Sequence, residues 1–282
     1  MKRIHAWVAL ALLASSCATM VKAPLDVEPE RLLPTGAAAY ARLDRATLAE
    51  VLASLPGSDP GSVESIVNRT DSITAAFVRQ TGPQEAVGIV AVAEGRYPAG
   101  AASLRLSSDP SWRRRGKVWE YGGGSLNLAF ADGGRAFLGT VPLDGMLAAA
   151  EAPGKDPIPA RWAEAWKSAV AVYLPDPMAM LSGRIPMGDG AVPILAMVLK
   201  ARPSTEGYNA TLYFEFGTER AAVVFSPLCR VFLYAAAHSM WPERAATVTD
   251  RAVWKTEGTV VSAADIPLDA ASMAAFMGLA GR

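Results

Sequence analysis

The first seventeen residues decide where the folded part of this chain can begin. Two basic residues, Lys2 and Arg3, precede an apolar run over residues 4–14, and two serines then lead to Cys17. A basic start, an apolar run and small residues form the pattern of a secretory signal peptide, which is removed after export. The run is about 11 residues long, too short for a bilayer core that needs roughly 20. We therefore expect the fold to lie beyond residue 16.

The residues that end at this cysteine, Leu13-Ala14-Ser15-Ser16-Cys17, resemble the lipobox of bacterial lipoproteins in its looser, spirochaete-like form. The resemblance implies cleavage before Cys17 and acyl chains, palmitate among them, on its sulfur and new amino group. The family prefers leucine three residues before the cysteine, whereas Leu13 lies four before it. Ala18 replaces the aspartate that the family uses for inner-membrane retention, which implies the outer membrane where one exists. The alternative is an ordinary signal peptide cut near Ser16 or Ala18, which releases a soluble protein.

Charge and composition limit the kinds of partner that the exported chain can bind. The whole chain has 27 Lys and Arg against 27 Asp and Glu, so removal of Lys2 and Arg3 leaves it slightly acidic. Nucleic-acid binding favours a strongly basic face, so we expect no nucleic-acid partner. Hydrophobic residues make up 51% of the chain, which indicates a folded body and not a disordered tail. We expect no transmembrane helix after the signal.

Hydrophobic periodicity and turn residues predict an α+β fold with a mostly antiparallel sheet. The apolar residues within 45–55 have helical spacing, and residues 72–79 and 86–93 are predicted to be adjacent strands. An acidic residue followed directly by glycine, at 132–134 and again at 257–258, indicates a hairpin turn. Short connections between successive strands favour antiparallel pairing. We further expect a helix over 98–115, interrupted near Asp109, a strand over 221–226, a helix over 228–241 and a strand over 248–254.

The second half repeats the pattern of the first. The triplet Pro142-Leu143-Asp144 recurs at Pro267-Leu268-Asp269, and at the same spacing one predicted hairpin falls on the other. With small gaps, Tyr40 matches Tyr173. Both triplets suit helix starts, since proline fits the first turn and aspartate favours the positive end. We predict a tandem duplication: a lipidated cysteine and tether over 17–36, modules over 37–152 and 168–282, and a linker over 153–167 whose Trp162 and Trp166 cover the seam.

Residues that could carry catalysis or hold a metal are few. No P-loop follows the glycine run at 122–124, which we read as a turn. Beyond the signal there are one histidine, His238, and one unlipidated cysteine, Cys229, too few for a zinc site. Both lie among apolar residues, which favours structural roles. We therefore predict no cofactor, no metal and no enzymatic activity.

One dense cationic cluster remains: Arg113, Arg114, Arg115 and Lys117, between Trp112 and Trp119. A solvated loop is one interpretation, and contact with anionic head groups or an acidic partner is the other. The function that we predict is a non-catalytic binding or assembly component of the cell envelope, anchored in the bilayer through the Cys17 acyl chains and facing the periplasm or the exterior. The alternatives are a small-molecule binder with a cleft between the modules, or an envelope enzyme.

Overall fold

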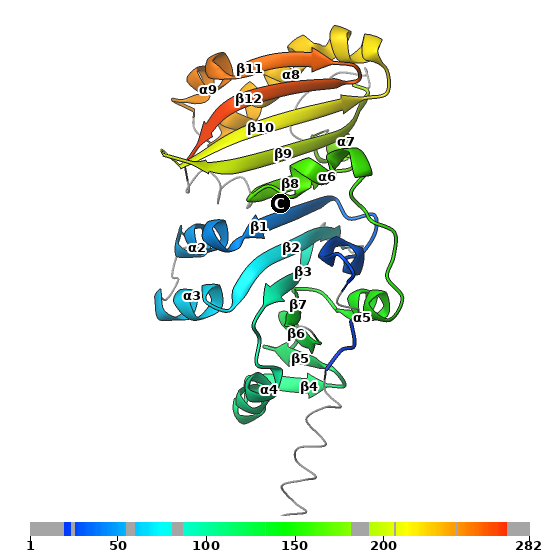
Figure 1. Cartoon of the computed structure of the whole chain (residues 1–282), viewed down its shortest axis with the longest axis vertical. Coiled ribbons are helices and arrows are strands. Elements are labelled where there is room, and N and C mark those ends of the chain that lie inside the picture. Colours follow the sequence, from blue (N-terminus) through cyan, green and yellow to red (C-terminus); the bar gives the residue numbers. More distant parts are fainter. Residues whose placement is uncertain are drawn as a thin grey trace, which may run out of the picture.

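The structure is a computed structural model, which describes residues 20–23, 26–54, 60–80, 87–132, 134–181, 192–205, 207–240 and 242–269. Its strands form one 12-stranded sheet in the order β11-β12-β10-β9-β8-β1-β2-β3-β7-β6-β5-β4 (Figure 1). Neighbouring strands are antiparallel throughout this order, which confirms the predicted fold class. The strands are β1 (Ala39–Asp44), β2 (Thr70–Arg79), β3 (Val87–Gly95), β4 (Trp112–Arg115), β5 (Val118–Tyr121), β6 (Leu126–Ala131), β7 (Arg135–Gly139), β8 (Val170–Leu174), β9 (Ile194–Ser204), β10 (Gly207–Phe216), β11 (Val253–Glu257) and β12 (Val260–Leu268).

Helices cover both faces of this sheet. They are η1 (Pro29–Leu32), α2 (Arg45–Ser54), α3 (Pro60–Val67), α4 (Ala99–Ser108), α5 (Asp144–Glu151), η2 (Ala160–Trp162), α6 (Ala163–Trp166), α7 (Pro177–Leu181), α8 (Glu219–Met240) and α9 (Ala245–Arg251). One core cluster joins the sheet to α2, α8 and α9, and we call that side the α8 face. A second cluster joins it to η1, α5, η2 and α6 on the η1 face. The alternating strand pattern therefore buries apolar side chains on both sides.

The two halves of the chain meet strand to strand. β1 pairs with β8, so that Tyr40 lies opposite Tyr173, and their rings stack with centroids 6.3 Å apart. Outward from this seam the first half runs β1, β2, β3, β7, β6 and the second runs β8, β9, β10, β12, β11. In each half the last strand of the closing hairpin pairs back onto the third strand. The common origin of the halves stays a prediction, and β4 and β5 extend the first half alone.

The predicted tether is wrong for the part of residues 17–36 that the structure describes. Val21, Leu32 and Leu33 are buried, and η1 packs on the η1 face of the sheet. Burial of each of these apolar side chains stabilises the fold by about 1.5–3 kcal/mol, and a solvent-exposed spacer would lose that stabilisation. Residues 17–19 and 24–25 lie outside the described residues.

The predicted linker is likewise part of the fold. Residues 153–167 include η2 and α6, and Ile158, Trp162 and Trp166 are buried. Trp162 and Trp166 belong to the same core cluster as Tyr40 and Tyr173, but the printed contacts of Trp162 are to Tyr213 and Glu215 of β10, so cover of the seam stays a prediction.

Three local predictions were wrong. The expected helix over 98–115 ends at Ser108, and β4 follows it. Residues 221–226, expected as a strand, belong to α8, which also contains Pro227. Thr218 Oγ1 caps the first turn of this helix by accepting a 3.1 Å hydrogen bond from the Ala221 N–H. The strand expected over 248–254 begins only at Val253, in β11, because residues 245–251 form α9. In each case tertiary packing outweighs local propensity.

The two Pro-Leu-Asp triplets have different surroundings. Asp144 begins α5 as predicted, whereas Pro267 and Leu268 lie in β12 opposite Asn209 and Tyr208. Proline is tolerated there because it is near the end of the strand. The predicted closing helix beyond residue 269 lies outside the described residues.

Candidate functional site

The chain enters the fold at the β4 end of the sheet. Met20 packs against a small apolar cluster, which we call the anchor-end cluster, built on α4, β5, β6 and β7. Its members are Ala99, Trp119, Phe130 and Ala136, with Met20, Tyr97, Ala102, Leu106, Trp112 and Leu128 partly buried around them. Cys17 lies outside the described residues, three positions before Met20. The described chain therefore begins at this end of the molecule.

Backbone and side-chain bonds fix the incoming segment in place. The Val21 N–H donates to the Phe130 carbonyl at 2.8 Å, and the Asp132 N–H donates to the Val21 carbonyl at 2.9 Å. Further along, Arg135 Nη2 donates to the Val27 carbonyl at 2.7 Å. Arg135 is buried, and it also pairs with Glu94 at 2.9 Å. Sequence reasoning missed this attachment, although Val21 and the leucine pair at 32–33 were the available signal.

The cationic cluster lies on the edge strand of the same end. Arg113, Arg114 and Arg115 are exposed in β4, and Lys117 follows a turn at Gly116, whose φ is 60°. Because side chains alternate along a strand, Arg113 and Arg115 point to one face and Arg114 to the other. The structure therefore brings the four predicted residues to one edge but divides them between its two faces.

Three of the four cations have modest local contacts. Arg115 lies 3.6 Å from Glu120 and Lys117 lies 3.8 Å from Glu151, and each pair has at least one well-exposed side chain, so both contribute little to stability. The Arg114 guanidinium lies 5.8 Å from the centre of the Trp119 ring, within the range of a cation–π contact. Charged residues on an edge strand also prevent pairing with other sheets. These contacts leave the cations accessible to an anionic surface.

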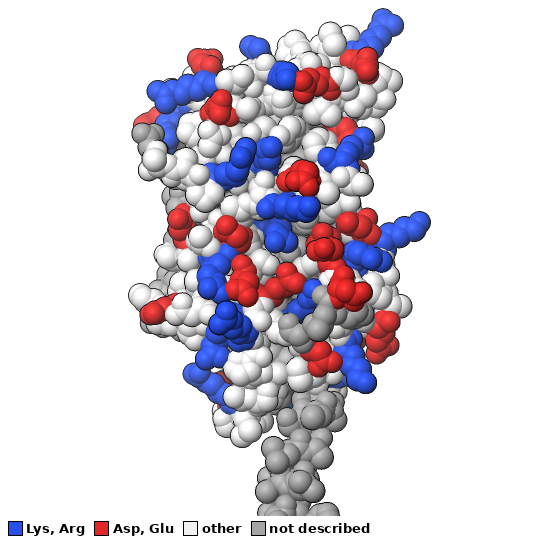
Figure 2. Space-filling view, in the orientation of Figure 1, with Lys and Arg blue, Asp and Glu red and all other residues white. Residues whose placement is uncertain are grey.

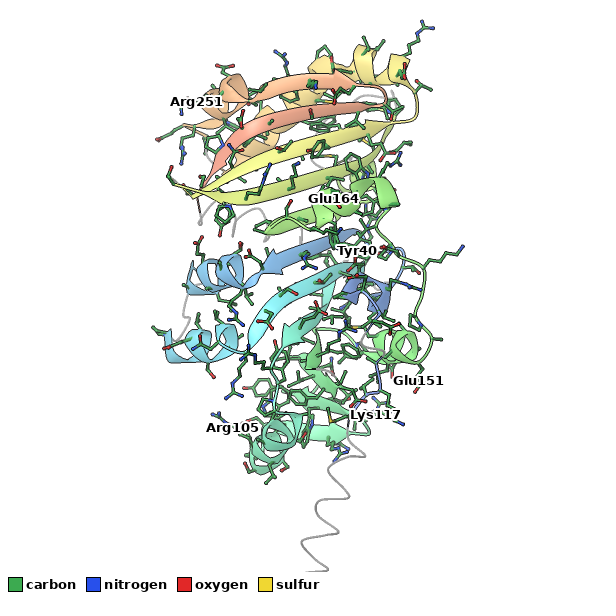
Figure 3. The ribbon with its side chains drawn as sticks, in the orientation of Figure 1. Tyr40, Arg105, Lys117, Glu151, Glu164 and Arg251 are labelled. Carbon is green, nitrogen blue, oxygen red and sulfur yellow. The ribbon has the colours of Figure 1, made fainter. Side chains whose placement is uncertain are left out.

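Apolar side chains project from the same end. Leu104 on α4 is 74% exposed, and Tyr121 is 42% exposed with its ring 5.1 Å from that of Trp112. Figure 3 places Arg105 and Lys117 at this lower end of the molecule. In Figure 2 the visible tip is mostly uncharged, with Lys and Arg side chains beside it. Apolar and cationic groups together are suited to the boundary between lipid head groups and water.

Cys229 and His238, which would be the nucleophile and the base of a catalytic pair, have different surroundings. Cys229 is fully buried in α8, as expected for a small hydrophobic residue, and burial raises the pKa of its thiol to about 12. His238 is exposed on the same helix and stacks on Tyr234 at 5.6 Å, which corrects the expectation of an apolar setting. The part of the chain that the structure describes contains no group of three or more His, Cys, Asp or Glu that could hold a metal ion. The glycines at 122–124 form a turn with positive φ at each position, as predicted.

A cavity of about 390 Å³ lies between α2 and α3. It is lined by Ala49, Ala53, Pro60, Val63, Glu64, Val67 and Asn68. This position is within the first half and not at the β1–β8 seam, where a cleft between modules was the alternative. The lining offers one carboxylate and one amide and is otherwise apolar.

Helix α8 is long and apolar enough, by length and composition, to cross a membrane, contrary to the sequence expectation. Its buried side chains, among them Cys229, Phe232 and Leu233, pack on the sheet in the α8-face cluster. The core helix of a soluble protein passes the same test, so this observation alone assigns no membrane span.

No protein-family model and no curated protein matches the sequence. Solved structures do match. The chain is similar in fold to TP0453, a lipoprotein of Treponema pallidum. Three crystal forms of TP0453 superpose with 16% sequence identity: form I with a TM-score of 0.67 over 91% of this chain and 99% of that one, form III with 0.65 over 90% and 99%, and form IV with 0.64 over 89% and 97%. At this identity the likeness to TP0453 concerns the fold.

Proposed function

We propose that this protein is a membrane-anchored lipoprotein of the cell envelope that acts by binding or assembly and not by catalysis. The observation that carries the proposal is the packing of Met20, three residues after Cys17, in the same end of the sheet as the cationic strand β4. Acyl chains on Cys17 hold this end at the bilayer. The fold shared with TP0453, itself a spirochaete lipoprotein, supports the same class.

The anchor and the cationic edge have separate contributions. A single acyl chain binds a bilayer only reversibly, at about 0.8 kcal/mol per buried methylene, so two or three chains are needed for lasting attachment. Each Lys or Arg near an anionic surface adds about 1 kcal/mol. Arg113, Arg114, Arg115 and Lys117 therefore orient the body on the membrane more than they hold it there. The rest of the sheet then extends away from the bilayer, with β11 at its far end.

The test of the anchor is Cys17→Ser in cells supplied with labelled fatty acid. The wild-type protein is expected to incorporate the label and to partition into the detergent phase, and the variant is expected to lose both. Ser16→Ala serves as the matched control, because it keeps a small residue before the cysteine. A Cys17→Ser protein that still takes up label and stays in the detergent phase contradicts the lipid anchor.

A further inference from the structure

The end of the sheet opposite the anchor is open. β11 is the last strand of the sheet among the described residues, and it pairs only with β12 there. Glu257 lies opposite Val260 across a two-residue turn, with no register shift along the pair. Hydrogen-bonded and non-bonded pairs alternate in such a hairpin, so the backbone groups of Trp254 and Thr256 point away from β12. An edge with outward backbone groups can accept another strand, and the exposed Lys255 and Glu257 of β11 restrict this to a partner strand with the opposite charges across from them.

Helix α8 presents apolar side chains on its outward side as well as on its buried side. Val223, Val224, Val231 and Tyr234 are 63%, 60%, 53% and 43% exposed. Successive members are one, seven and three residues apart, which places all four within roughly 100° of the helix circumference. A surface helix of a soluble protein normally has polar residues on that side. The row, which we call the α8 stripe, therefore indicates a contact surface.

The α8 stripe and the open edge belong to the same end of the molecule. The Arg230 guanidinium of α8 lies 5.4 Å from the centre of the Trp254 ring of β11. At the start of the helix, Glu219 Oε1 lies 3.8 Å from where a Cβ of Gly258 would be, beside the β11–β12 turn. Figure 1 shows α8 and β11 together at the upper end, away from α4 and β4.

We propose that this end is a homodimer interface, in which β11 pairs antiparallel with β11 of a second copy. In the register that places Thr256 opposite Thr256 of the second copy, Lys255 of each copy lies opposite Glu257 of the other. Lys255 and Glu257 already contact each other within one chain, so this register forms an alternating ring of four charges. It also pairs the outward backbone groups of Thr256 with their own copies.

The symmetry of this arrangement brings together the side of each α8 nearest β11, which carries Val223 and Tyr234 beside Arg230, since Arg230 reaches the Trp254 ring. A two-fold axis perpendicular to the sheet keeps both copies of α8 on the same face, side by side across the axis. A closed two-fold contact uses the same patch on both subunits and leaves no free edge. Within the chain, β1 and β8 already meet as an antiparallel pair with Tyr40 opposite Tyr173. The proposed dimer repeats that relationship between chains.

The dimer has a consequence for the anchors. Strands lie about 4.8 Å apart, so the two β4 ends of a joined sheet are roughly 100 Å from each other. The two copies then carry their lipids at opposite ends of one body, which either lies along one membrane or bridges two facing surfaces. This consequence rests on the proposed lipid anchor, whereas the dimer itself does not.

The test uses the exported chain with Cys17→Ser, so that no lipid is present. Thr256→Cys is expected to give a disulfide-linked dimer on mild oxidation, because hydrogen-bonded antiparallel partners have Cα atoms about 5.5 Å apart, within disulfide range. Lys255→Cys is the control for register and Ser107→Cys on α4 the control for position. Both are expected to crosslink at least tenfold less.

Sedimentation of the same protein without the added cysteine is expected to show a dimer at micromolar concentration. Val223→Glu with Tyr234→Glu is expected to weaken that dimer at least tenfold while leaving thermal melting unchanged. A monomer at high micromolar concentration overturns the proposal, and so does equal crosslinking at 256 and 107. Binding of the monomer to lipid vesicles that is lost in the double glutamate variant also overturns it, because the α8 stripe then faces a membrane.

Discussion

The Trp162 indole N–H donates a 3.0 Å hydrogen bond to Glu215 Oε2, joining η2 to β10. Glu215 is almost fully buried and also pairs with Arg161, whose side chain is half exposed. The Trp162 ring lies 5.3 Å from that of Tyr213 on the same strand. The segment that sequence reasoning treated as a linker thus satisfies a buried carboxylate of the second half.

Trp162→Phe is expected to destabilise the fold by about 1–3 kcal/mol, because it keeps most of the ring packing but leaves buried Glu215 short of a donor. Urea unfolding followed by circular dichroism measures the change. Trp254→Phe is the matched control, since its longer 3.5 Å bond to the Thr249 carbonyl is only partly buried. Equal losses in the two variants contradict the assigned role of the Trp162–Glu215 bond.

Glu30 in η1 is predicted to lower stability as pH rises. Burial, with smaller effects of Asp156 and Glu28, raises the pKa of its carboxyl, and its Oε2 atom has no hydrogen-bond partner. The folded state therefore holds this proton at a pH where the unfolded state has released it, so stability falls as pH rises from the unfolded pKa through the folded one. Glu30→Gln removes the ionisation and is expected to flatten this dependence and to stabilise the protein at neutral pH.

The control for this prediction is Glu243→Gln, at an exposed position outside η1. Thermal melting across the acidic to neutral range compares the two variants with the wild type. A Glu30→Gln protein whose stability follows the wild-type pH curve contradicts the predicted ionisation.

Charge reversal of Arg113, Arg114 and Arg115 to Glu is expected to weaken binding to anionic vesicles by at least roughly a hundredfold, given about 1 kcal/mol for each cation lost. The measurement uses the unlipidated Cys17→Ser protein, because acyl chains would mask the effect. Reversal of three exposed arginines elsewhere, Arg79, Arg202 and Arg251, is the matched control. If both sets weaken binding equally, β4 has no special part in membrane contact.

His238→Gln is expected to change stability by less than about 0.5 kcal/mol and to leave the cellular role intact, because the side chain is exposed and its described contact is the Tyr234 ring. Thermal melting and complementation of a deletion strain test the two parts. A variant that melts normally but fails to complement favours an enzyme in place of a binding protein.

Cys229 is expected to resist alkylation in the native state. Its thiol is buried, its pKa is raised to about 12, and its Sγ lies 3.6 Å from the Phe225 carbonyl. Thiolate is the reactive form, so iodoacetamide near pH 8 should modify it only after denaturation. Rapid native labelling, at the rate of a cysteine placed at exposed Ser107, contradicts this burial.

The sequence alone identified features that depend on few neighbouring residues. The export pattern and the lipobox-like residues before Cys17 are local, as are the hairpins at 132–134 and 257–258 and the alternation of the strands. From these the α+β class and the antiparallel sheet followed correctly. The burial of Cys229 also followed from its apolar neighbours.

Only the tertiary structure decided where non-local contacts form. The N-terminal segment packs in the core because Phe130, Asp132 and Arg135 bind its backbone, and these partners are more than a hundred residues away. The arginines belong to a strand because Trp112–Arg115 pairs with β5. The seam between the halves depends on pairing Tyr40 with Tyr173. Backbone donors and acceptors in a strand are satisfied by whichever strand lies alongside, and that choice depends on the whole packed sheet.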